Sequence, residues 1–92
     1  MANKYFDTCK EVNSYWGEKM PMMTMEELAE LAQAISKLER KLDDIDKVKE
    51  LRQNVIDEIG DVAISCHALM HRYGIKPEEI EKRINEKLGK KY

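Results

Sequence analysis

Two pairs of acidic residues are the side chains of this sequence best suited to chemistry. Glu27 and Glu30 stand three positions apart, and Glu58 and Asp61 repeat this spacing later in the chain. Residues three apart on a helix place their Cβ atoms about 5–6 Å from each other, so each pair would share one helix face. If the two pairs converge, their mutual repulsion favours a bound divalent cation. Carboxylate oxygens without Cys or His suit Mg²⁺, with Mn²⁺ as a substitute, rather than zinc.

A structural explanation of the same acids stays open. Acidic residues are common on solvent-facing helix surfaces, where pairs with this spacing also arise by chance. Glu27 has a candidate role in capping as well. Thr24 is predicted to be the N-cap of a helix, and a capping box places an acid three residues after the N-cap. Spacing alone does not decide between a metal site and helix capping.

The elements that would position these acids are helices. Only four Gly and two Pro interrupt 92 residues, of which 42% are hydrophobic and 37% charged, a composition typical of amphipathic helices. The sequence predicts a single all-α domain over residues 1–92, with a helical hairpin as its core and flanking helices beside it. Gly74 suits the end of the third helix and Pro77 the start of the last one. The predicted helices cover residues 3–19, 24–42, 47–73 and 77–88, with a connection at 20–23 and a turn at 43–46.

The third predicted helix carries an apolar seam suited to antiparallel packing against the second. On a helical wheel, Glu27 and Glu58 lie roughly 70–80° from the centre of the apolar stripe of their helix, and Glu30 and Asp61 lie further out on the same side. The acids are therefore predicted to flank the seam, and the four carboxylates would converge beside the core if the two acidic edges face each other. The predicted seam residues are Val48, Leu51, Val55, Ile59, Val62, Cys66, Leu69 and Tyr73.

Size and charge narrow the classes of partner. A chain this small buries little core by itself, so we expect a homo-oligomer that completes a four-helix-type bundle. The formal net charge of −2 argues against a general nucleic-acid binder, which needs an excess of Lys and Arg. No apolar run resembles a signal peptide or approaches the roughly 20 residues of a membrane span. We therefore expect a cytoplasmic protein without nucleic-acid or membrane partners.

The acidic motifs resemble a known signature. Glu26-Glu27-Leu28-Ala29-Glu30 and, after a helical hairpin, Glu58-Ile59-Gly60-Asp61 are similar to the EExxE…ExxD pattern of the MazG-like nucleoside triphosphate pyrophosphohydrolases, which belong to the all-α NTP pyrophosphatase superfamily. The resemblance extends over residues 20–87. It implies Mg²⁺-dependent hydrolysis of the α–β phosphoanhydride of a nucleoside triphosphate, which yields the monophosphate and pyrophosphate. Water would attack the α-phosphorus, with one carboxylate or a metal-bound hydroxide as the base.

The resemblance also implies roles for single residues. By position, Glu27, Glu30, Glu58 and Asp61 match the catalytic metal ligands. Glu26 matches the first acid of the motif, whose part is less defined. Members of the family assemble as dimers or tetramers, in agreement with the homo-oligomer expected from the size of the chain.

Candidate substrate contacts lie outside the acidic motifs. Lys82 and Asn85 are candidates for a late Lys and Asn that contact phosphates in many members, although their spacing differs from the common pattern. Asn54, one turn before Glu58, either orients a ligand or stays a solvated surface residue. Trp16, the sole tryptophan, either stacks on a base or packs the first helix onto the bundle. Which basic residues around the hairpin turn reach phosphates is left open among Lys37, Arg40, Lys41, Lys47, Lys49 and Arg52.

Two other functions compete with a nucleotide-pool enzyme of broad specificity. One is a non-catalytic assembly or regulatory module built on the same helical scaffold. The other is a hydrolase of the superfamily that is specific for dCTP or dUTP. The sequence leaves base and sugar preference and oligomeric order open.

Overall fold

The protein is all-α, as the sequence predicts. The computed structural model describes residues 2–91, with side chains described for residues 4–89. No helix in this part of the chain is both long and apolar enough to cross a membrane. The elements are α1 (Ala2–Trp16), the 3₁₀-helix η1 (Gly17–Lys19), α2 (Met20–Glu39), α3 (Val48–Tyr73) and α4 (Pro77–Lys91).

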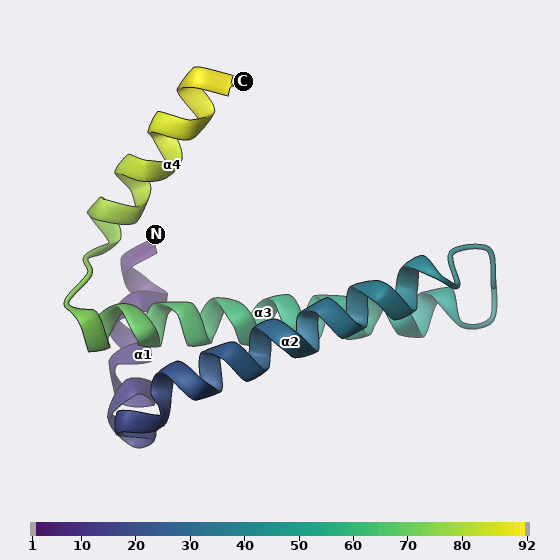
Figure 1. Ribbon diagram of the computed structural model, residues 1–92, viewed down its shortest axis with the longest axis horizontal. Coiled ribbons are helices and arrows are strands. Elements are labelled where there is room, and N and C mark those ends of the chain that lie inside the picture. The colour runs from purple at the N-terminus through teal and green to yellow at the C-terminus, as the bar shows by residue number, and fades with distance from the viewer. Residues whose placement is uncertain (1, 92) are drawn as a thin grey trace.

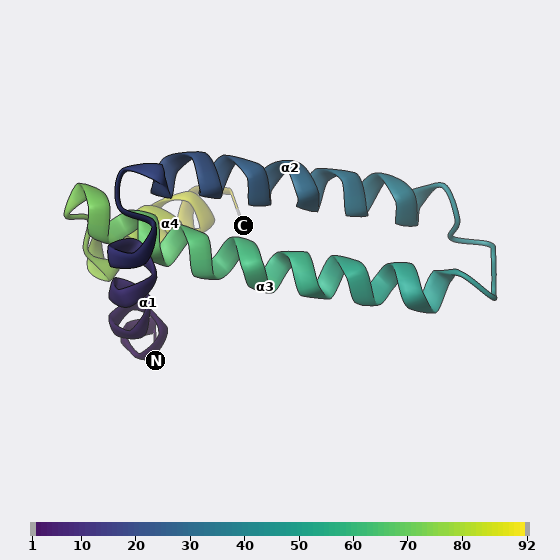
Figure 2. The ribbon, with the colours of Figure 1, turned by 90° about the horizontal axis from the view of Figure 1, so that it is seen from below.

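Helices α2 and α3 form a long antiparallel hairpin (Figures 1 and 2). The connection spans residues 40–47 and includes the predicted turn. The carboxylate of Asp44 organises it by accepting the backbone N–H groups of Asp46 (3.1 Å) and Lys47 (3.2 Å), the local hydrogen bonding for which Asp is favoured in turns. The predicted hairpin core is therefore confirmed.

The start of α2 differs from the prediction. The helix begins at Met20 and contains Pro21 in its first turn, so residues 20–23 are helical and do not form a connection. Proline is tolerated there because the first N–H groups of a helix have no intrahelical partner. Thr24 is consequently buried inside the helix, where its hydroxyl donates to the carbonyl of Met20 (3.0 Å) and lies 3.5 Å from the carbonyl of Ser65. The predicted N-cap at Thr24 is wrong, and Glu27 loses its capping role.

Helix α1 crosses the open end of the hairpin (Figure 1). Gly17 ends it with a positive φ of 53°, which glycine adopts without steric cost. The side chains of Cys9, Met20 and Ala68 are buried together and join α1 to the hairpin. A second attachment comes from His71, whose Nε2 lies 2.6 Å from the carbonyl oxygen of Phe6 while the two rings stack at 4.0 Å. Helix α1 is thus fixed at the open end of the hairpin, away from the connection at residues 40–47.

Helix α4 projects away from the hairpin (Figure 1). Gly74 ends α3 with a positive φ of 63°, and α4 starts at Pro77, both as predicted. The carboxylate of Glu79 accepts the backbone N–H of Lys76 (2.9 Å) and so caps the first turn. Among the described elements, α4 packs only against α1. Its apolar stripe of Ile80, Ile84 and Leu88 is exposed.

The seam between α2 and α3 contains both glutamates of interest. Its members are buried or half-buried and recur at steps of three and four residues, the spacing of antiparallel bundle cores. On α2 they are Met20, Thr24, Glu27, Leu31, Ala34 and Leu38. On α3 they are Leu51, Val55, Glu58, Val62, Ser65 and Leu69.

The predicted seam of α3 is wrong at three positions. Ile59 and Cys66 are exposed, and Glu58 and Ser65 take their places; Tyr73 at the end is also exposed. At each turn of a helix, either of two neighbouring residues, three or four positions further on, can continue the seam, and hydrophobicity predicts the apolar residue. In the structure the polar residue lies in the seam at these turns, so Glu58 is a seam residue and does not flank the seam.

Residues next to the seam define two faces of the hairpin. One position changes the direction of a side chain by about 100°, and because the helices are antiparallel, equal shifts on both helices lead to the same side. The polar face, one position before the seam, consists of the exposed residues Glu26, Glu30, Gln33, Lys37, Asn54, Asp57 and Asp61. The apolar face, one position after it, consists of the exposed residues Met25, Leu28, Ala32, Ile35, Ile56, Ile59, Ala63 and Cys66.

Candidate metal centre

Three of the predicted acids meet between α2 and α3. Glu27 from α2 and Glu58 and Asp61 from α3 each offer a carboxylate oxygen, and these oxygens lie within 4.8 Å of one another. Glu27 and Glu58 reach this point from the seam, and Asp61 reaches it from the polar face. Antiparallel packing thus brings together acids that are far apart in the sequence.

The burial of these carboxylates makes their charge costly. Glu27 and Glu58 are half-buried, and Oε2 of each is buried without a hydrogen-bond partner. Leaving a charged oxygen desolvated and unpaired is unfavourable by an amount that depends strongly on its surroundings. A cation bound by these oxygens would remove that cost.

The electrostatic surroundings of the two glutamates are uniformly acidic. Burial, followed by the charges of Glu30, Asp61, Glu58 and Glu26, raises the pKa of Glu27. Burial raises the pKa of Glu58 in the same way, with Glu30, Asp61 and Asp57 adding to the effect. Every charged residue that shifts these two pKa values is acidic. None of them supplies a positive charge to balance the carboxylates. The donor set, consisting of carboxylates alone, fits Mg²⁺ or Mn²⁺.

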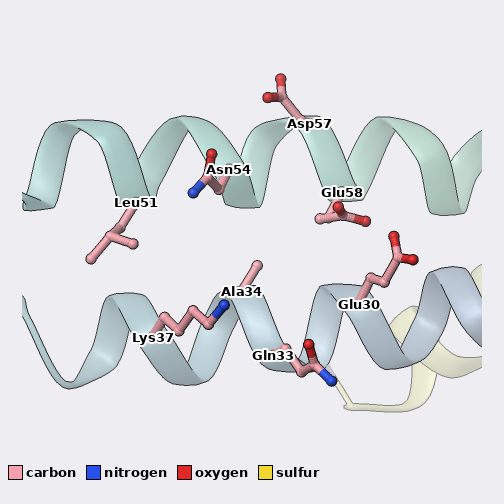
Figure 3. A pocket seen from close by; sticks show the side chains of 8 residues that line it. All are labelled: Glu30, Gln33, Ala34, Lys37, Leu51, Asn54, Asp57 and Glu58. Atoms are coloured by element: carbon pink, nitrogen blue, oxygen red, sulfur yellow. The ribbon is translucent and has the colours of Figure 1, made fainter.

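Glu30 lies beside this trio. Its carboxyl is within hydrogen-bonding reach of Glu58, a contact that also raises the pKa of Glu58. Figure 3 shows the two carboxyl groups pointing toward each other across the space between the helices. The structure therefore brings all four predicted acids into one region, with Glu30 at its edge on the side of the hairpin turn.

A polar pocket of about 220 Å³ begins at Glu30 and Glu58 and extends toward the hairpin turn. Lys37 from α2 and Asn54 from α3 line it (Figure 3). The sequence left Lys37 among six candidate bases. Its position seven residues after Glu30, two turns along the same face, is the signal that would have singled it out.

A second pocket of about 250 Å³ lies on the other side of the acids, toward α1. Glu27 and Asp61 line it together with Val12 and Trp16 of α1. Trp16 also packs against the buried cluster that joins α1 to the hairpin. The predicted packing role of Trp16 is therefore confirmed, and its indole also borders the acids.

Three other predicted site residues lie outside this centre. Glu26 is exposed on the polar face and acts on Glu27 only through its charge. Lys82 and Asn85 line a surface depression formed by α4 alone. Since α4 packs only against α1 among the described elements, one chain does not bring these two residues to the acids.

Known proteins resemble this chain over the helices that carry the acids. The MazG-like family matches residues 23–92, which include the whole of α3 and most of α2. The chain is also similar to a Bacillus subtilis (strain 168) protein named "Uncharacterized protein YvdC", with 34% identity over 85 residues that cover 84% of this chain and 80% of the relative. No solved structure matches the chain. The family match covers the acidic centre and most of the sequence, and the chain belongs to the MazG-like family.

Proposed function

We propose that this protein is a Mg²⁺-dependent pyrophosphohydrolase that converts nucleoside triphosphates into monophosphates and pyrophosphate. The observation that carries the proposal is the set of carboxylate oxygens from Glu27, Glu58 and Asp61 within 4.8 Å of one another in a MazG-like chain. The unpaired buried oxygens of Glu27 and Glu58 support a cation at this point. Mn²⁺ is the expected substitute, because it also accepts oxygen ligands. Removal of surplus or non-standard nucleotides is a role that fits this activity.

The proposed roles of the acids follow from their positions. Glu27, Glu58 and Asp61 would hold the cation. When bound, Mg²⁺ would clamp phosphate oxygens of the triphosphate and polarise the attacking water. Glu30, also predicted to be a ligand, lies at the edge of the trio and is exposed. This position supports a role as the base that takes a proton from water as it attacks the α-phosphorus.

Residues around the acids would hold the substrate. Trp16 borders Glu27 and Asp61, which supports stacking of its indole on a nucleobase. Asn54 lines the pocket next to Glu58, which supports a hydrogen bond to the triphosphate. Lys82 and Asn85 could take part only if α4 of one chain packs near the acids of another.

We also propose a homodimer or homotetramer. The chain exposes 7381 Å² of surface, whereas a compact monomer of its mass exposes about 5,500 Å². Leu28 is 48% exposed and Ile59 54% exposed on the apolar face. A second hairpin packed on this face would complete a four-helix bundle, and the polar face would remain open to substrate.

A screen of common and modified nucleoside triphosphates with Mg²⁺, scored for released pyrophosphate, tests the activity. Glu58→Ala and Asp61→Ala should each lower turnover by about a hundredfold or more, a loss typical for charge-stabilising groups. Glu50→Ala, which removes an exposed acid from the first turn of the same helix, should not. Unchanged turnover in the Glu58 and Asp61 variants, with helical content preserved in all three, would refute the proposal. The same screen identifies a dCTP- or dUTP-specific enzyme.

The exposed apolar face favours one alternative, a non-catalytic helical module that works through assembly. Mg²⁺ titration separates the two functions. An enzyme of the proposed type should gain thermal stability with Mg²⁺, because the ion binds only the folded state, and Glu58→Ala should lose that gain. A module without a metal site should show no such carboxylate-dependent gain.

A further inference from the structure

The acids lie between two pockets of different chemistry on the same side of the hairpin. The pocket toward the turn offers a cation, Lys37, and the amides of Gln33 and Asn54, beside the carboxylates of Glu30, Asp57 and Glu58 that a bound Mg²⁺ would offset. The pocket toward α1 offers an indole and aliphatic side chains, from Trp16, Val12 and Ile64. A nucleoside triphosphate has the same asymmetry, because its phosphate chain is anionic and its base is a flat ring with π faces.

We infer that the triphosphate lies along the polar face in one direction, with the departing pyrophosphate in the Lys37–Asn54 pocket and the nucleoside beside Trp16. This inference rests on the pyrophosphohydrolase function proposed above and deepens it. The α-phosphorus is then placed at the acids, between the two pockets. Lys37 becomes a binding residue for the leaving group.

The direction of the Lys37 side chain supports this assignment. Side chains on an α-helix tilt toward its N-terminus, and the N-terminus of α2 lies beyond Glu30 and Glu27 as seen from Lys37. Figure 3 shows the lysine running along α2 with its ammonium group on the side of the acids. The ammonium therefore lies beside the polar pocket, where phosphates bound to the acids would extend.

The surroundings of the Trp16 pocket support placing the base on that side of the acids. Val12 and Ile64 line the Trp16 pocket and also a larger adjoining cavity of about 590 Å³ between α1 and α3. Tyr5 and His67 line that cavity too, and Nδ1 of His67 is buried without a hydrogen-bond partner. Lys4 also lines this cavity, but most of its lining is apolar, which is typical of small-molecule sites and suits a base better than a chain of phosphates.

The chemistry of the step explains why a cation belongs on the turn side. The oxygen of water forms a bond to the α-phosphorus while the bond from that phosphorus to the bridging oxygen breaks. The bridging oxygen leaves with the electron pair as part of pyrophosphate, and the proton released by water passes to Glu30. Negative charge therefore builds up on the leaving group, and an ammonium group placed there stabilises it.

Product binding tests this direction without relying on turnover. We would measure the affinities of inorganic pyrophosphate and of each common nucleoside monophosphate, with Mg²⁺, for the full chain. Lys37→Met should weaken pyrophosphate binding by about 10- to 100-fold, the range for a hydrogen bond to a charged group. Monophosphate affinity should be unchanged. Lys37→Arg should restore part of the loss, and Lys41→Met, which removes an exposed lysine beyond the end of α2, should have no effect.

The single tryptophan provides a second readout. A monophosphate should change the fluorescence of Trp16, and pyrophosphate should not. The inference is overturned if the wild-type protein does not bind pyrophosphate, if Lys37→Met leaves that binding intact, or if the variant mainly weakens monophosphate binding. If pyrophosphate binds as described but no triphosphate is hydrolysed, the proposed activity fails while the anion site stands.

Discussion

The polar and apolar faces of the α2–α3 hairpin share one seam but differ in what they can bind. Each exposed residue of the apolar face follows a seam residue by one position, and each residue of the polar face precedes one. The polar face carries carboxylates that line two pockets, whereas the apolar face exposes large hydrophobic side chains such as Leu28, Ile35 and Ile59. This difference is the basis for proposing a charged ligand on one side of the hairpin and a second copy of the chain on the other.

The largest expected effect comes from a charge on the apolar face. Leu28→Glu should weaken self-association by about a hundredfold or more, because an unpaired charge would be buried in the proposed interface. Sedimentation equilibrium over a concentration series measures this change. Ala29→Glu, one position further along the same helix and exposed, is the matched control and should leave assembly intact. Equal assembly of both variants would show that the apolar face is not the interface.

Neutralising Glu58 in the seam should separate the stability of the hairpin from its response to Mg²⁺. Glu58→Gln keeps the shape of the side chain but removes a charge that neighbouring acids disfavour. The melting temperature of the metal-free variant should therefore rise above that of the wild type, while stabilisation by Mg²⁺ should shrink or disappear. Thermal denaturation in chelator and in excess Mg²⁺ measures both effects. Asp57→Asn, one position earlier on the polar face, should retain the Mg²⁺ response.

The pH dependence of stability follows from the same charges. The pKa values of Glu27 and Glu58 are raised in the folded state, whereas an unfolded glutamate has a pKa of about 4.3. Folding therefore favours the protonated form, and this contribution to stability is present at low pH and is lost as pH rises through the raised pKa values. In chelator, the advantage of Glu58→Gln over the wild type should be largest at neutral pH and should decrease toward pH 4. A constant difference would contradict this origin.

The smallest expected effect concerns the seam away from the acids. Thr24→Val removes the hydroxyl that donates to the carbonyl of Met20 and lies near that of Ser65. The loss should be about 1 kcal/mol of unfolding free energy, the usual value for one hydrogen bond, and Mg²⁺ binding should be unaffected. Urea denaturation measures it, with Thr8→Val as a control because Thr8 makes the corresponding bond on an exposed surface.

The sequence predicted the type and order of the helices because their signals are local. Pro77 and Gly74 have clear positional preferences, and the apolar repeat is long enough to specify a hairpin. It failed at Thr24 because N-cap preference and a buried position within a helix both suit threonine. The prediction from sequence failed at Glu58 because the burial of a glutamate depends on the residues that face it, and those residues belong to another helix.

The acids of the candidate site were predictable, but their surroundings were not. Spacing and motif resemblance singled out Glu27, Glu30, Glu58 and Asp61, and α2 and α3 bring the carboxylates of all but Glu30 into one trio. Lys37 was not separated from the other bases, because its spacing from Glu30 gains meaning only in the pocket that α2 and α3 form together. The distance of Lys82 from the acids depends on the direction of α4, which a short amphipathic stripe does not encode.

Each face of the hairpin lies only one residue before or after the seam. This close spacing limits where the chain can gain or lose residues. Inserting or deleting one residue in the middle of α2 or α3 would turn every later side chain by about 100°. In α3, a deletion before the acids would bring Ile59 and Val62 to the positions of Glu58 and Asp61, whereas an insertion there would turn Glu58 onto the apolar face. The connection at residues 40–47 has no such constraint, because both helices keep their own register across it. Among homologous chains, differences in length should therefore concentrate in that connection.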